Sequence, residues 1–209
     1  MEVKEYIVIE TDKLFSRYGF KSVTMDDIAK HLGISKRTIY QHFADKDELV
    51  NVLIDEKLDA YDDELKAYAE EGVNAVQEVF LGIAHLDEWL NTLNAKLFYD
   101  LQKYHPNAWL KFKNFKEKCL TAWIVDNIKR GIQEGVYRSE VNVDILTQLR
   151  LEQGNIIFGY DDRYTKHKYT ITEVMIEITQ HFLYGICNMK GKLLIEHYKE
   201  QLLNNNYKN

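Results

Sequence analysis

The chain has 209 residues, of which 45% are hydrophobic and 29% are charged, a balance that excludes a disordered protein. The formal net charge of -6 argues against a protein that coats nucleic acid regardless of its sequence. No apolar run approaches the roughly 20 residues of a membrane span, and no signal peptide is visible at the N-terminus. The two cysteines, Cys119 and Cys187, match no metal or redox spacing, so we expect a reduced, cytoplasmic protein.

Apolar residues at helical spacing predict a first helix from about Val3 to Tyr18, and Gly19 is suited to end it. Three more helix starts follow in quick succession, each behind a side chain that can accept a hydrogen bond from free backbone N–H groups. They are Thr24 before MDDIAKHL, Ser35 before KRTIYQHF and Asp45 before KDELVNVLI. The N-terminal part of the chain is therefore predicted to be a group of short helices followed by a longer fourth one.

A tight turn is predicted between the second and third helices, at Leu32-Gly33-Ile34. Gly33 can adopt the left-handed conformation that ends a helix, and Ile34 then folds back onto Ile28 and Ala29. Two short helices joined by such a turn form a helix-turn-helix.

The rest of the chain has the pattern of further amphipathic or buried helices, and its single proline suits long ones. The fourth helix is expected to end near Ala69. Later helices are expected at about Val73–Leu90, Thr92–Tyr104, Asn107–Glu134, Val143–Phe158, Glu173–Lys190 and Lys192–Leu203, with the last break at Gly191. The predicted fold class is all-α, with a three-helix head in residues 1–48 joined to a larger helical domain in residues 49–209.

The third helix has the pattern of a DNA-reading helix. If Ile39 and Phe43 face the core, Arg37 and Gln41 point outward. Arginine suits the O6/N7 edge of guanine, and glutamine suits the N6/N7 edge of adenine. Side chains expected to meet phosphates or flank the reading face are Lys21, Thr24, Ser35, Lys36, Thr38, Tyr40, His42 and Lys46. The alternative is an ordinary solvated face, although an aromatic at the exposed position 40 then has no reason in folding.

The segment FSRYGFKSVTMDDIAKHLGISKRTIYQHFADKDELVNVL resembles the DNA-binding part of the tetracycline-repressor (TetR) family of bacterial regulators. The matching positions are Phe15, Gly19, Thr24, Ile28, Ala29, Gly33, Ser35, Thr38, Tyr40, Phe43, Lys46 and Leu49. The resemblance implies that the outward residues of the third helix face DNA. Arg37 departs from the glycine that many members have there, which favours readout by a side chain over close approach of the backbone.

The resemblance also implies a homodimer formed by late helices and a pocket for a small effector among the middle ones. Candidates for the dimer seam are Leu146, Leu149, Ile156, Ile157, Ile178, Phe182 and Ile186. Candidates for the pocket are Trp89, Phe98, Tyr99, Trp109, Phe112, Phe115 and Trp123. For both sets the alternative is an ordinary intramolecular core, because apolar and aromatic stripes at helical spacing usually pack inside a protein.

An enzyme is not expected, since the seven histidines form no i, i+4 pair around a carboxylate and no metal or cofactor pattern is visible. We predict a ligand-responsive transcriptional regulator, a repressor whose dimer binds a palindromic operator and is released by a small apolar or aromatic effector. Two alternatives stay open: a dimeric DNA binder without any effector, and a helical small-molecule-binding protein or enzyme with a vestigial reading head.

Overall fold

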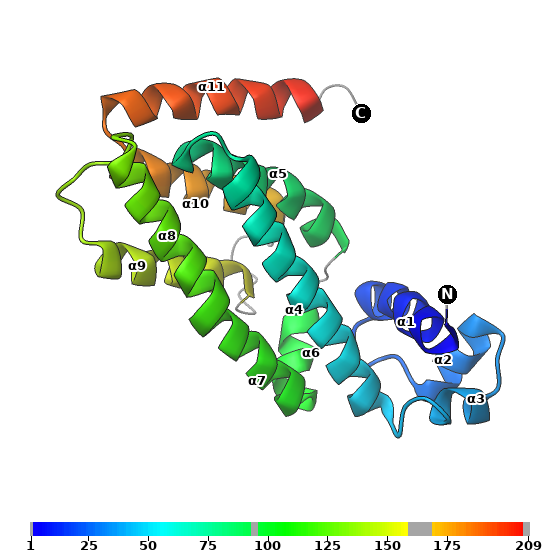
Figure 1. Cartoon of the computed structure of the whole chain (residues 1–209). Coiled ribbons are helices and arrows are strands. Elements are labelled where there is room, and N and C mark those ends of the chain that lie inside the picture. The colour runs from blue at the N-terminus through cyan, green and yellow to red at the C-terminus, as the bar shows by residue number, and fades with distance from the viewer. Residues whose placement is uncertain (1, 93–95, 159–168, 207–209) are drawn as a thin grey trace. The chain divides into compact units, whose positions relative to one another are not determined.

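The computed structural model describes residues 2–92, 96–158 and 169–206. Apart from one isolated β-bridge, the regular structure of these residues is helical, which confirms the predicted all-α class. The elements are α1 (Val3–Tyr18), α2 (Met25–Leu32), α3 (Lys36–Tyr40), α4 (Lys46–Glu71), α5 (Ala75–Thr92), α6 (Lys96–Tyr104), α7 (Pro106–Phe115), η1 (Lys116–Leu120), α8 (Thr121–Gln133), α9 (Val143–Phe158), α10 (Ile171–Ile186) and α11 (Met189–Asn206) (Figure 1). No described helix combines the length and apolarity needed to cross a bilayer.

The chain forms two compact units. Unit 1 contains α1 to α3, α4 as far as Tyr61, α6 and α7, whereas unit 2 contains α4 from Asp62, α5, η1 and α8 to α11. This division differs from the predicted domain boundary between residues 48 and 49. That position lies inside α4, which continues without interruption from Lys46 to Glu71. The predicted head is therefore only part of a larger compact unit.

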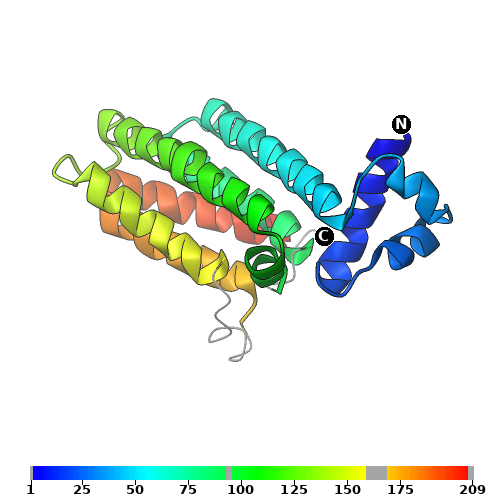
Figure 2. The same ribbon diagram turned by 90° about the horizontal axis from the view of Figure 1, so that it is seen from below.

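In unit 1 the predicted caps and turn of the head all form, and α1, α2 and α3 lie together (blue in Figure 2). The capping bonds run from Asp27 N to Thr24 Oγ1 (3.2 Å), from Thr38 N to Ser35 Oγ (3.1 Å) and from Glu48 N to Asp45 Oδ1 (2.8 Å). Gly33 has a φ of 66°, in the left-handed region, and the N–H of Ile34 donates to Ala29 O at 3.1 Å. The helix-turn-helix is thus built by the residues that predicted it.

The third helix is shorter than expected, since α3 ends at Tyr40 instead of Phe43. The N–H groups of His42 and Phe43 both donate to Ile39 O at 3.0 Å, so the chain tightens there into a turn. The turn places Phe43 inside the core with 1% of its surface exposed.

Helices α6 and α7 share the core of the head. Leu97, Leu101 and Ala108 are buried in the same apolar cluster as Ile39 and Phe43. Polar bonds strengthen this attachment: the buried carboxylate of Asp100 on α6 accepts the Lys21 N–H at 2.9 Å, and His105 Nδ1 lies 2.7 Å from Asp47 Oδ1 on α4. These contacts explain why unit 1 extends beyond residue 48.

The continuous helix predicted over 107–134 is wrong in its middle, where the five-residue π-helical segment η1 separates α7 from α8. The hydroxyl of Thr121 donates to Lys116 O, five residues earlier, at 3.0 Å. This side-chain bond gives the Lys116 carbonyl a donor within the π turn, where the regular i to i+4 pattern of an α-helix is interrupted.

In unit 2, α10 and α11 run side by side in both views (Figures 1 and 2). The expected break at Gly191 is wrong, because α10 ends at Ile186 and Gly191 lies inside α11. A Cβ atom at position 191 would lie 2.2 Å from Val136 O, so glycine is needed there for close backbone approach and not for ending a helix.

Candidate nucleic-acid interface

The third helix presents the orientation that the sequence predicted. Ile39 is fully buried, whereas 48% of the Tyr40 surface is exposed, and Arg37 and Gln41 are exposed as well. An arginine, a glutamine and a tyrosine therefore share an outward surface on and just after α3. Such a surface offers forked hydrogen-bond donors for base edges and a phenol for a phosphate.

The other candidates also belong to unit 1. Exposed side chains are Lys21, Thr24, Ser35 and Lys36, and partly buried ones are Thr38, His42 and Lys46. The Ser35 and Thr38 hydroxyls lie 2.9 Å apart. The Ser35 side chain is also the N-cap of α3, so a phosphate that approached the cap would meet both hydroxyls at the positive end of the helix.

Thr24 is tied into its capping box. Its hydroxyl lies 2.6 Å from Asp27 Oδ2, and its N–H donates to the same oxygen at 2.9 Å. Hydrogen bonds from the Thr24 side chain and backbone lower the pKa of the Asp27 carboxyl. A phosphate at Thr24 would have to share these donors with an ionised carboxylate.

Lys36 forms an exposed ion pair with Asp26, and the two atoms are 3.0 Å apart. The hydrogen bond to Asp26 raises the pKa of the Lys36 ammonium. Because exposed ion pairs contribute little, this lysine can exchange the carboxylate for a phosphate at small cost.

Lys46 has a structural role that the sequence did not reveal. Its ammonium donates to the carbonyl oxygens of Phe20 and Val23, at 2.9 and 3.1 Å, and so ties the loop before α2 to the start of α4. Partial burial lowers the pKa of this amine. Two of its three protons are therefore used inside the head, and a phosphate contact stays a prediction for the third.

We expect Lys46→Ala to lower the free energy of unfolding by about 1.5–3 kcal/mol, the usual contribution of hydrogen bonds to a charged group. Lys36→Ala, which removes only an exposed pair, is the matched control and should change stability by less than about 0.5 kcal/mol. Urea unfolding of both variants measures the difference. Equal, near-zero losses would show that Lys46 does not stabilise the head.

The predicted pocket aromatics are divided between the two units. Phe98, Tyr99, Trp109, Phe112 and Phe115 belong to unit 1, Trp123 belongs to unit 2, and the side chain of Trp89 lies outside the described residues. In unit 1, Trp109 stacks on Phe112 with ring centroids 5.4 Å apart, and Phe98 lies at the same distance from Phe112. Trp109 and Phe112 also pack against the core cluster of the head, so a role for these rings in ligand binding stays a prediction.

Unit 2 contains a cavity of about 580 Å³, and Trp123 is the one predicted aromatic among its described lining residues. The lining residues are Asp62, Leu65, Lys66, Ala69, Glu78, Cys119, Ala122, Trp123, Asp126, Asn127 and Arg130. Most of them occupy one face of α4 and one face of α8, at spacings of three and four residues. This spacing can be recognised in the sequence, but the residues at these positions are mostly not aromatic, so the aromatic pattern did not point to them.

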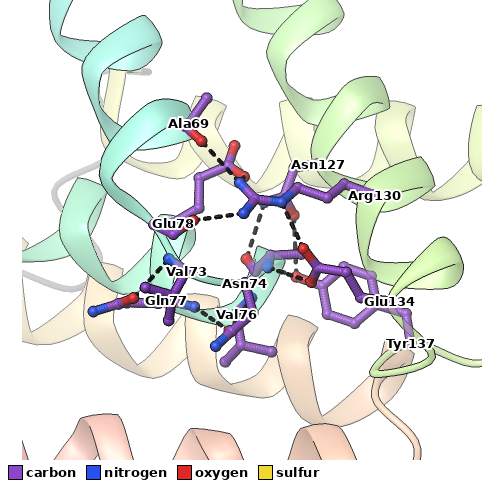
Figure 3. A network of polar contacts seen from close by, with 12 residues as sticks. Ala69, Val73, Asn74, Val76, Gln77, Glu78, Asn127, Arg130, Glu134 and Tyr137 are labelled. Atoms are coloured by element: carbon purple, nitrogen blue, oxygen red, sulfur yellow. Dashed lines mark hydrogen bonds and ion pairs between the residues drawn. The ribbon is translucent and has the colours of Figure 1, made fainter.

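Arg130, one of the lining residues, holds together several chain segments of unit 2 (Figure 3). Its guanidinium donates to Glu134 Oε1 at 2.7 Å and to Glu78 Oε2 at 3.2 Å. It also donates to the carbonyl oxygens of Ala69 and Gly72, near the C-terminal end of α4. Arginine supplies enough fixed donors to satisfy all of these acceptors at once.

The polar side chains of Asn127 and Tyr137 extend this network (Figure 3). Asn127 Nδ2 donates to Ala75 O at 3.0 Å, and the buried Tyr137 hydroxyl donates to Asn127 Oδ1 at 3.0 Å. Glu134 accepts the Ala75 N–H at 2.8 Å. Desolvation raises the pKa of the Tyr137 phenol well above its usual value, so it stays a neutral donor.

Residues 7–53 match the family model described as bacterial regulatory proteins, tetR family. An uncharacterized HTH-type transcriptional regulator, YvaF, of Bacillus subtilis (strain 168) is 32% identical over 86% of this chain and 93% of its own length. An HTH-type transcriptional regulator of Staphylococcus aureus (strain USA300) is 37% identical over 92% of this chain and 85% of its own. The crystal structure of a TetR-family transcriptional regulator from Agrobacterium tumefaciens has a similar fold, with a TM-score of 0.73 at 16% identity, over 88% of this chain and 97% of that one.

Proposed function

The chain belongs to the tetR family of bacterial transcriptional regulators, and from this premise we propose that it is a repressor whose homodimer binds a palindromic DNA operator. The observation that carries the proposal is the outward surface formed by Arg37, Tyr40 and Gln41 above a fully buried Ile39. An α-helix with this surface fits the major groove, and a dimer would place two such helices about 34–36 Å apart, on successive turns of the duplex.

We place the dimer seam on the outer face of α9. Ile145 and Leu149 are 65% and 48% exposed, four residues apart on one side of this helix. The predicted seam residues Phe182 and Ile186 are buried in the core of unit 2, and they drop out of the proposed seam. Leu146 and Ile178 are partly buried, and the side chains of Ile156 and Ile157 lie outside the described residues. Exposed apolar side chains on one helical face favour contact with a second copy.

The proposed control of DNA binding is release by a small molecule. A ligand that binds the non-operator state more tightly than the operator-bound state must shift the protein towards release, and operator must weaken the ligand by the same factor. Ligand titrations with and without operator measure this reciprocity. Equal ligand affinities would refute release by a small molecule and leave a DNA binder without an effector.

We expect Arg37→Ala to weaken binding to the preferred operator by about 1–3 kcal/mol and to relax sequence preference at one base pair. The reason is that a forked arginine at an exposed position reads a guanine edge with two hydrogen bonds. Lys36→Ala is the matched control, since loss of a phosphate contact should weaken all duplexes alike and lower the salt slope by about 1. Selection of bound sites from a random duplex pool, followed by affinity measurements at several salt concentrations, gives both readouts.

The same selection tests the proposed function as a whole. A palindromic consensus with half-sites one turn apart is the expected result. Failure to enrich any sequence would favour the alternative of a helical small-molecule-binding protein with a vestigial head.

A further inference from the structure

We propose that the cavity of unit 2 is the effector site and that it takes a small ligand with a flat apolar body and one positive charge. The proposal rests on the proposed function, because it names the ligand class and the place at which a small molecule acts. The cavity volume of about 580 Å³ lies within the range of sites for drug-sized ligands.

The apolar part of the cavity suits a flat ring. Leu65, Ala69, Ala122 and Trp123 contribute apolar surface to its lining, and the two alanines are small. The indole N–H of Trp123 is buried and donates to no residue within the described parts of the chain. An aromatic ligand stacked on Trp123 would bury its ring and could bring an acceptor to this N–H.

The charges that line the cavity favour a cation. Three carboxylates and two cations contribute: Asp62, Glu78 and Asp126 against Lys66 and Arg130. Both cations are already neutralised, since Lys66 lies 2.7 Å from Asp62 and Arg130 pairs with Glu78 and Glu134. Asp126 is exposed and pairs with no described basic side chain.

An ammonium or guanidinium group on the ligand would meet two favourable partners. The face of Trp123 attracts a cation through the quadrupole of the indole ring, and Asp126, three residues further along α8, supplies an unneutralised carboxylate. An anionic ligand would have to displace a carboxylate from Arg130 or Lys66 and would then face the remaining acidic groups. The cavity therefore selects by charge as well as by shape.

The cavity also lies where a ligand can act on the connections to unit 1. The chain passes from unit 1 to unit 2 between Tyr61 and Asp62 and between Phe115 and Lys116. Two lining residues follow these crossings closely: Asp62 is the first residue beyond one of them, and Cys119, in the π-helical segment η1, is the fourth residue beyond the other. Irregular π turns often mark sites where a helix adapts to function. A ligand held by α4, η1 and α8 would thus contact two segments close to the points at which the chain crosses between the units.

The test uses the full chain and three ligands that share one ring: naphthylmethylammonium, naphthylmethanol and naphthoate. Quenching of tryptophan fluorescence and calorimetry give their affinities. We expect the ammonium compound to bind about 5–30 times more tightly than the carboxylate, with the alcohol in between. No binding by any of the three, or tighter binding of the carboxylate, would overturn the proposed ligand class.

Variants locate the site. Asp126→Asn should weaken the ammonium compound about fivefold and leave the alcohol unchanged, because it removes one charge and little volume. Glu117→Gln, an exposed carboxylate on η1 that does not line the cavity, is the matched control and should change neither affinity. Trp123→Phe should weaken all three ligands, and the bound ammonium compound should protect Cys119 from alkylation. Equal effects of Asp126→Asn and Glu117→Gln would overturn the assignment of the site.

The DNA readout separates this inference from the proposed function. If the operator weakens naphthylmethylammonium, and the compound releases operator from Asp126→Asn only at about fivefold higher concentration than from the wild type, the cavity is the effector site. If the ligand binds as predicted and the operator does not affect it, the regulatory assignment is overturned while the ligand class stands. If no operator can be selected at all, the proposed function fails, and the three affinities still decide the ligand class.

Discussion

Arg130→Ala should lower the free energy of unfolding by about 3–5 kcal/mol, the usual loss when one partner of a buried ion pair is removed. The reason is the carboxylate of Glu78, which is only 2% exposed and would lose its cationic partner. The carbonyl oxygens of Ala69 and Gly72 would lose their donors at the same time. Urea unfolding followed by circular dichroism measures the loss.

The pH dependence of this loss identifies its cause. Burial raises the pKa of the Glu78 carboxyl even in the wild type, although Arg130 acts against it. Without Arg130 the pKa should rise further. A raised folded-state pKa means that stability is present at low pH and lost as the pH rises through that pKa, so Arg130→Ala should be less harmful at about pH 5 than at about pH 8.

Arg138→Ala is the matched control for Arg130→Ala. Arg138 is 45% exposed, pairs with the exposed Glu140 and donates to Gly185 O at the surface, so its removal should cost less than about 1.5 kcal/mol at either pH. A loss for Arg130→Ala that did not vary with pH would show that packing, and not the stranded charge of Glu78, sets the effect. A loss equal to that of Arg138→Ala would contradict the role of the network.

Local signals in the sequence were enough to predict the head. Thr24, Ser35 and Gly33 act on backbone groups within a few residues of themselves, so their effects depend little on the rest of the fold. The orientation of α3 followed in the same way, because burying Ile39 leaves Arg37 and Gln41 outside. Short-range chemistry of this kind can be read from a single chain.

Features that depend on distant partners were missed. Lys46 resembled a surface cation, but it bonds to carbonyl oxygens more than twenty residues earlier in the chain. Gly191 resembled a helix stop, but its reason is the approach of Val136, far away in sequence. The division into two units has the same origin, since the buried Asp100 attaches α6 to the head through the backbone of Lys21. No helical periodicity encodes such pairings.

The candidate site shows the same limit. Counting aromatics placed the pocket among rings that in unit 1 pack on one another, such as Trp109 and Phe112. The cavity of unit 2 combines one aromatic, Trp123, with charged side chains from three helices, α4, α5 and α8. The charge balance of such a site is known only when the positions of α4, α5 and α8 relative to one another are known.

Phe43→Ala should abolish specific DNA binding by unfolding the head. Phe43 is 1% exposed in the core cluster of unit 1, and removing a buried phenylalanine ring costs about 3–5 kcal/mol. Hydrogen exchange of the amides in α1 to α3, together with operator binding, measures the effect. We expect the protection of these helices and DNA affinity to be lost together.

Tyr40→Ala, three residues before Phe43, tests DNA recognition without a large effect on folding. Tyr40 is 48% exposed, so the substitution should change stability by less than about 0.5 kcal/mol. It should still weaken operator binding by about 0.5–1.5 kcal/mol, since it removes one hydrogen bond to the duplex. Unchanged operator affinity in Tyr40→Ala, together with the expected loss of DNA affinity in Phe43→Ala, would mean that the exposed tyrosine does not contact DNA. The reading surface would then reduce to Arg37 and Gln41, and the ring at position 40 would need another partner.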